Sequence, residues 1–154
     1  MRESIGGTWL LGFVVLFIVL FSAYLAYSIN YTKAFKTKNY IINTIEENEG
    51  FSKYDGSTIS AETDDALKQC RKTECKVYYY LRNAGTATTT IDSSKCENTD
   101  DYNEGGYCVR KINTTNGGAY YKVTTFINIE IPLIWKTFTI PIKGETKVIY
   151  NVQD

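Results

Sequence analysis

The chain has 154 residues, and its 17 lysines and arginines are balanced by 17 aspartates and glutamates, so the formal net charge is zero. This balance argues against nucleic-acid binding, because phosphate contacts need a surplus of basic residues. The chain contains no histidine, which excludes a Ser-His-Asp triad, a histidine-ligated metal and an imidazole general base. The length favours one compact domain with an appendage.

The first distinct segment is an uncharged run over residues 8–27. Twenty such residues are long enough to cross a bilayer as a helix. Twelve of them are Leu, Ile, Val or Phe, and at about 0.3–0.6 kcal/mol each they favour insertion by about 4–7 kcal/mol. Trp9 at one end, and Tyr24, Tyr27 and Tyr31 at the other, suit the two membrane–water interfaces.

Two other interpretations of this run compete with a retained anchor. A cleaved signal peptide would have Arg2 as its basic region, residues 9–21 as its apolar region and residues 26–28 as a small-x-small site. A buried helix of a soluble core is disfavoured because the run is apolar on every side. The retained anchor is favoured because helical character continues past the run, which a secretory signal does not require.

The continuation covers residues 29–49 and contains neither proline nor glycine. Its apolar residues recur at helical spacing, and Gly50 suits the position just past a helix end. The apolar positions are Ala34, Phe35, Ile41, Ile42 and Ile45. The sequence therefore predicts one helix over residues 8–49, about 63 Å long at 1.5 Å per residue, with its first half in lipid and its second half against a protein domain.

The four cysteines, Cys70, Cys75, Cys96 and Cys108, all follow this helix. An even number fits two disulfides in an oxidising compartment. A zinc site and redox catalysis are weaker interpretations, because no C-x-x-C pair is present, and four reduced thiols also stay open. Of the three possible connectivities, pairing as local loops, Cys70 with Cys75 and Cys96 with Cys108, is preferred, and Cys75 with Cys108 is the main competitor.

The C-terminal part is expected to be a small α+β unit. Its tyrosine-rich segments favour strands, although sugar stacking on the rings is an alternative. The expected elements are a helix over 57–72, a strand over 76–82, a long loop over 83–106, strands over 107–114 and 119–131 joined by the turn Asn116-Gly117-Gly118, and a last hairpin of strands 137–142 and 145–152 around Lys143-Gly144.

These elements predict an α+β fold, in which a long N-terminal helix packs on a small antiparallel sheet. One face of this sheet is expected to be exposed to solvent, and one short helix completes the domain. Three regions follow: residues 1–28 as the N-terminal stretch and transmembrane helix, 29–50 as the amphipathic continuation, and 51–154 as the outer domain. The lysines after the span, Lys33, Lys36 and Lys38, favour a cytoplasmic C-terminal side. The cysteines favour the opposite orientation, and we give them more weight.

The assembled parts resemble a pilin-type subunit, and more closely the TadE-like minor pilins or pseudopilins of bacterial Tad systems, particularly those of Gram-positive bacteria. The likeness covers nearly the whole chain. It is carried by Glu3, Ser4, the apolar span, the helix extension to Glu49, and the tail segments 127–132 (INIEIP) and 140–146 (IPIKGET).

The resemblance implies that a prepilin peptidase removes a leader and that a glutamate near the new N-terminus pairs with a neighbour's amino group within lipid. Glu3 is the only early acid, at position three of this chain rather than five. The resemblance further implies that the apolar helix contacts other pilus subunits. The residues expected in subunit assembly are Glu3, Trp9, Phe13, Phe17 and Phe21.

The expected function is thus a non-enzymatic structural or assembly component of a surface pilus or secretion system. Membrane lipid and other pilin or assembly subunits are its expected partners; no catalytic residue, metal, cofactor, nucleic acid or small-molecule substrate is expected. The expected location is the cell membrane, with the N-terminus cytoplasmic and the C-terminal domain extracytoplasmic, or a cell-surface pilus. The alternative is a single-pass anchored binding module outside any filament.

Overall fold

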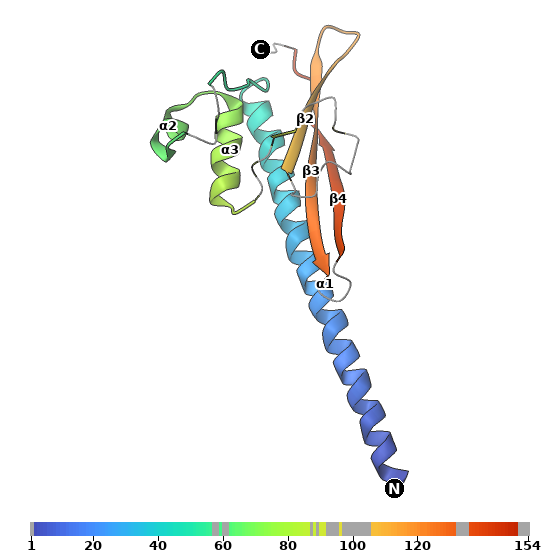
Figure 1. Ribbon diagram of the computed structural model, residues 1–154. Helices are drawn as coiled ribbons and strands as arrows, with labels where there is room; N and C mark the ends of the chain where they lie inside the picture. Colours follow the sequence, from blue (N-terminus) through green and yellow to red (C-terminus); the bar gives the residue numbers. More distant parts are fainter. Residues whose placement is uncertain are drawn as a thin grey trace.

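The computed structural model describes residues 2–56, 59, 62–86, 88, 90–91, 96, 106–131 and 136–150, with the backbone alone for 2–6, 91, 127, 129–131 and 136–138. It has an α+β fold in which one long helix runs along a small sheet and extends far beyond it at its N-terminal end (Figure 1). Two short helices lie beside the C-terminal half of this long helix (Figure 1).

The long helix, α1, spans Arg2–Glu47 without a break, which confirms the predicted continuity. The left-handed residue that ends it is Glu49, with a φ of 51°, and not the following Gly50. The N–H of Glu49 donates to the carbonyl of Glu46 (3.4 Å), and the N–H of Gly50 donates to that of Ile45 (3.0 Å). These two bonds satisfy carbonyls that a helix end leaves without partners.

The second half of α1 buries one stripe of side chains. The stripe recurs every three or four residues, as an amphipathic helix requires. Its members are Ala34, Thr37, Ile41, Thr44 and Ile45. Phe35, which the sequence places on the same face, is 43 % exposed instead.

Two short helices follow, α2 (Asp64–Gln69) and α3 (Thr73–Asn83). The predicted helix over 57–72 is therefore shorter than expected. It begins after Thr63, whose side chain accepts a hydrogen bond from the N–H of Ala66 (3.4 Å). The first turn carries Asp64 and Asp65, and the last turn carries Lys68, an order of charges that stabilises the helix dipole.

The predicted strand over 76–82 is wrong, because this segment lies within α3. A short apolar run does not distinguish a strand from a buried helix by its spacing. In the structure Thr73, Val77 and Leu81 are almost completely buried, four residues apart on one helix face. Packing of that face against α1 and the sheet outweighs the strand propensity of the tyrosines between them.

The start of α3 is stabilised by a distant residue. The N–H of Thr73 donates to Ser52 Oγ (3.0 Å), and the N–H of Glu74 donates to the carbonyl of Ser52 (3.2 Å). At the other end Gly85 has a left-handed φ of 62° and donates its N–H to the carbonyl of Arg82 (3.2 Å). Ser52 lies 21 residues before Thr73, so no local sequence pattern announces this helix start.

The sheet has the strand order β1-β2-β3-β4. The three long strands are antiparallel neighbours, and the two-residue strand β1 pairs parallel to β2. The strands are β1 (Thr90–Ile91), β2 (Gly106–Asn113), β3 (Ala119–Ile131) and β4 (Lys136–Glu145). The predicted strands over 107–114 and 119–131 are thus confirmed, as is the turn between them, where Gly117 has a positive φ of 80°.

The predicted last hairpin around Lys143-Gly144 is wrong, because β4 continues through both residues. The hairpin partner of β4 is β3, from the pair Ile131↔Lys136 to the pair Lys122↔Glu145. A Cβ on Gly144 would lie 2.8 Å from Ile42 Cδ1 and 2.8 Å from Lys38 Cδ. Glycine stands here because β4 passes close to α1, and not because the chain turns.

The main core lies between α1, α3 and the inner face of the sheet. It is formed by Ile41, Ile45, Val77, Leu81, Tyr107, Tyr121 and Val123. The outer face of the sheet is partly buried, which corrects the expectation that this face is exposed to solvent. Thr124 and Phe126 on that face are 3 % and 7 % exposed, because Cys96, Cys108 and Phe126 pack as a separate cluster.

Candidate membrane and assembly surface

The N-terminal half of α1 carries the largest apolar surface of the described residues. From Gly7 to Lys33 no side chain is buried, and the large apolar residues other than Val19, which is intermediate, stand 40–70 % exposed on all sides of the helix. The helix is long enough to cross a membrane, and its most apolar window has a mean hydropathy of 2.5. A helix that is apolar all round is stable only when another apolar medium covers it.

The four aromatic residues predicted for subunit assembly form two pairs along this exposed half. Trp9 and Phe13 meet edge to face with ring centroids 5.1 Å apart, and Phe17 and Phe21 stack at 6.5 Å. All four are at least 54 % exposed. The backbone of Glu3 belongs to α1, but its side chain is outside the described part of the structure. The position of its carboxylate is therefore not given.

An open depression of about 280 Å³ interrupts this surface near its N-terminal end. It is lined by Thr8, Trp9, Gly12, Phe13 and Leu16. A Cβ on Gly12 would meet nothing within 4 Å. The depression therefore follows from the missing side chain of Gly12 between larger neighbours, the geometry that lets a second helix approach closely in lipid.

A stripe of stacked rings continues from the exposed half toward the sheet. Tyr27 and Tyr31 stack with centroids 6.0 Å apart, and Tyr31 and Phe35 stack at 6.4 Å. The ammonium group of Lys38 lies 4.3 Å from the centre of the Phe35 ring, a distance at which the ring attracts a cation. The sequence pattern indicates the tyrosines, whereas it places Phe35 in the core and so does not predict the contact between Phe35 and Lys38.

The second half of α1 is fixed to the sheet by polar contacts as well as apolar ones. Thr125 Oγ1 donates to the carbonyl of Ala34 (3.3 Å), and the N–H of Lys147 donates to Glu46 Oε1 (2.9 Å). Ala34 also packs against Ile142 of β4. These contacts lie at both ends of the buried stripe, so the exposed half of α1 extends from a rigidly held base.

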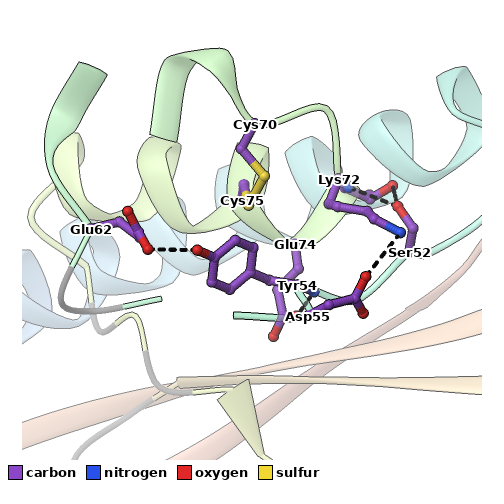
Figure 2. The surroundings of a disulfide bond; sticks show 9 residues. Ser52, Tyr54, Asp55, Glu62, Cys70, Lys72, Glu74 and Cys75 are labelled. Carbon is purple, nitrogen blue, oxygen red and sulfur yellow. Dashed lines mark hydrogen bonds and ion pairs between the residues drawn. A yellow bond between two sulfur atoms is a disulfide. The ribbon is translucent and has the colours of Figure 1, made fainter. Parts of the chain in front are cut away.

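Two disulfides join the cysteines in the pairing that the sequence analysis prefers. Cys70 is bonded to Cys75, and Cys96 to Cys108. The first joins the end of α2 to the first turn of α3 (Figure 2). The second joins the segment before β2 to the outer face of the sheet.

The surroundings of the first disulfide hold the segment after α1 in place (Figure 2). The N–H of Tyr54 donates to Glu74 Oε2 (2.7 Å), and its hydroxyl donates to Glu62. The hydrogen bond to the Glu62 carboxylate raises the pKa of Tyr54. Lys72 pairs with Asp55 at 3.5 Å. These contacts connect α2 and α3 to the segment before them, which is a structural role.

The metal-ligating side chains of the described residues are not gathered in one place. Within that part of the chain, no three cysteine or carboxylate side chains form a group that could hold a metal ion. The most strongly buried titrating group is Tyr107, whose pKa burial raises well above its usual value. Its hydroxyl accepts a hydrogen bond from Thr90 Oγ1 (2.9 Å), which adds a side-chain link between β1 and β2.

The fold and this surface define a class: an α+β protein whose single long apolar N-terminal helix is able to cross a membrane and carries a disulfide-bonded sheet domain. The chain matches no protein-family model, and no curated protein or solved structure shows significant similarity to it.

Proposed function

We propose that this protein is a non-enzymatic minor pilin or pseudopilin, a structural or assembly component of a bacterial Tad-type pilus or secretion system. The observation that carries the proposal is the continuity of α1. One unbroken helix changes from an exposed apolar half to a half buried against the domain. A subunit that moves from a membrane into a filament needs such a helix, because lipid and neighbouring helices cover it in turn.

The aromatic pairs and the depression at Gly12 supply the surface for those neighbouring helices. Helices in lipid gain little from apolar contact alone, because lipid tails are equally apolar, and they associate through close packing. Trp9 and Phe13 project beside the depression that Gly12 leaves open. A large side chain of a neighbouring α1 would fill that space.

The proposed orientation places the N-terminus in the cytoplasm and the sheet domain outside. Its support is the pair of disulfides, because disulfides form and persist in oxidising compartments. The lysines after the span lie on a folded helix, and not in a short loop of the kind for which positive charge sets orientation.

The test is the native N-terminus, determined by mass spectrometry on sheared surface filaments, membranes and culture medium. We expect the chain in sheared filaments with its apolar helix intact. A soluble form that begins near residue 29 would contradict the proposal, because the helix would then be a cleaved signal. A filament-assembly mutant of the same cells is the control, in which the chain should remain in the membrane.

Recovery from membranes alone would favour the second candidate, an anchored binding module. One feature supports it: a depression of about 310 Å³ on the sheet domain, around the turn between β2 and β3. Tyr150 borders it with a 66 % exposed ring, beside Asn113 and Thr114. An exposed ring next to amide and hydroxyl groups suits a polar ligand.

A further inference from the structure

Strands β3 and β4 run along α1 and past the end of its buried stripe. The direction of β4 is fixed by three contacts with α1: Ile142 packs on Ala34, Gly144 lies against Ile42, and the N–H of Lys147 reaches Glu46. From Lys147, which follows β4, back to Lys136 at its start, the chain therefore moves toward the N-terminal end of α1, as Figure 1 shows for β4.

The end of this hairpin reaches the level at which α1 becomes fully apolar. Six residues separate Ile142 from Lys136, which is about 20 Å of strand. If β4 runs parallel to α1, about 20 Å corresponds to about 13 helical residues and the level of Phe21. A strand inclined by about 60° still advances about 10 Å, to the level of Tyr27.

The same level carries the tyrosines of α1. Tyr24, Tyr27 and Tyr31 are 64 %, 40 % and 43 % exposed, and exposed tyrosines next to an apolar span concentrate in the headgroup layer. That layer is about 5–7 Å thick on each side of a hydrocarbon core of about 30 Å. The tyrosines place the membrane surface at this level along α1, and the strand register independently places the hairpin end at the same level.

The sequence of the hairpin end suits such a surface. We define the hairpin end as residues 129–131 of β3 and 136–138 of β4, where Ile129 pairs with Phe138 and Ile131 with Lys136. Between these two pairs, Glu130 pairs with Thr137. A sequence that combines apolar residues with a lysine favours the boundary between acyl chains and phosphates.

We propose that the hairpin end lies in the phospholipid headgroup layer, so that the sheet domain contacts the membrane at a second place besides α1. The proposal rests on the proposed membrane anchoring by α1. If residues 8–27 fill the hydrocarbon core, the level of Tyr27 is the edge of that core, and if a span of the same length is displaced toward residue 2, the level of Phe21 is the edge. With the hairpin end in the headgroup layer, the domain is unable to swing freely on its helix.

The chain contains two tryptophans, Trp9 in α1 and Trp135 directly before Lys136, and these make the test direct. The full chain is reconstituted in phosphatidylcholine vesicles with and without lipid brominated near the headgroup. Trp135→Phe leaves Trp9 as the reporter of α1, and Trp9→Phe leaves Trp135, the sequence neighbour of Lys136, as the second reporter. Tyr150→Trp in the Trp9→Phe/Trp135→Phe background is the matched control, because Tyr150 follows the opposite end of β4.

We expect brominated lipid to quench Trp9 and Trp135 to a similar extent and to leave the Tyr150→Trp reporter unquenched. Quenching of Trp9 with no quenching of Trp135 would overturn this inference and leave the anchoring by α1 intact. No quenching of Trp9 would overturn both. Thr137→Trp in the same double-phenylalanine background repeats the measurement from within β4, so that a folding defect at position 135 does not decide the result.

Discussion

At the scale of single residues, Gly144 shows how a sequence signal is misread. A lysine–glycine pair between two β-prone segments favours a turn, yet Gly144 lies inside β4 where the strand meets Ile42 and Lys38 of α1. Glycine in a strand marks either a turn or a close approach. Here the cause is a close approach to α1, which lies about a hundred residues away in the sequence, so the local pattern does not distinguish the two cases.

Gly144→Val is expected to destabilise the domain by about 1–3 kcal/mol, because the branched side chain would overlap Ile42 and the stem of Lys38. Gly144→Ala should be nearly neutral. The flexible ends of the Ile42 and Lys38 side chains can shift, and the lower conformational entropy of the unfolded chain stabilises the fold by about 0.4–1 kcal/mol. Thermal unfolding of the full chain in detergent, followed by near-ultraviolet circular dichroism, measures both. Lys143→Ala, at the exposed neighbour, is the control, and equal effects of valine and alanine would contradict the packing role.

Tyr107 predicts a pH dependence of stability at alkaline pH. Burial raises its pKa in the folded protein, so the unfolded chain releases this proton first, at about pH 10. Folding stability should therefore fall as the pH rises above about 10, by at most about 1.4 kcal/mol per pH unit from this group. Below that pH the contribution of Tyr107 is constant.

The measurement is the urea midpoint of wild type and Tyr107→Phe between about pH 8 and pH 11. The decline above about pH 10 should be less steep in the variant, which has no phenolic proton to release. Parallel curves would show that Tyr107 does not titrate differently in the folded and unfolded states. The comparison with phenylalanine removes the contribution of the exposed tyrosines and lysines, because both proteins share them.

At the scale of elements, the long helix and the two central strands could be predicted from sequence because their patterns are long and regular. Strand β3 alternates over 13 residues, and α1 combines an apolar span with helical spacing beyond it. The segment that became α3 could not be assigned, because its apolar run is short and its start is stabilised by Ser52. The hydroxyl of Ser52 reaches Thr73 only after the chain has folded.

The two disulfides should contribute unequally to stability. In the chain-entropy account, the bond between Cys96 and Cys108, 12 residues apart, contributes about 3 kcal/mol, and that between Cys70 and Cys75, five residues apart, about 2 kcal/mol. Replacing each pair by alanine and measuring the free energy of unfolding tests the order. A larger loss from the Cys70/Cys75 pair would show that contacts around α2 and α3, and not loop closure, dominate.

At the scale of the whole molecule, the exposed surface that carries the proposed function could be located from sequence, whereas its geometry could not. The span and its terminal aromatics follow from hydropathy, whereas the residues proposed for subunit assembly, Trp9, Phe13, Phe17 and Phe21, follow from the resemblance to pilin-type subunits. The depression at Gly12 and the stripe of stacked rings that continues to Lys38 depend on the directions in which side chains on successive turns of α1 point. The height of the hairpin end along α1 depends on strand register, which a sequence pattern does not give.

Glu3→Ala should impair recruitment into filaments and leave membrane insertion intact, if its carboxylate pairs with a neighbour's amino group in lipid. The measurement is the amount of chain in sheared filaments relative to membranes. Glu3→Asp is the matched control, because it keeps the charge and should keep partial recruitment. Unchanged recruitment of Glu3→Ala would count against the pilin proposal.

The contact between Lys147 and Glu46 joins residues 101 positions apart, which has a consequence for the order of events during synthesis. The amphipathic half of α1 leaves the ribosome about a hundred residues before the strand that covers it. At about 5–20 residues per second, the apolar stripe waits about 5–20 s for its partner. During that time the membrane surface is the nearest apolar environment, so a nascent chain should hold this half of the helix along the bilayer and lift it into the domain only after β4 has been synthesised.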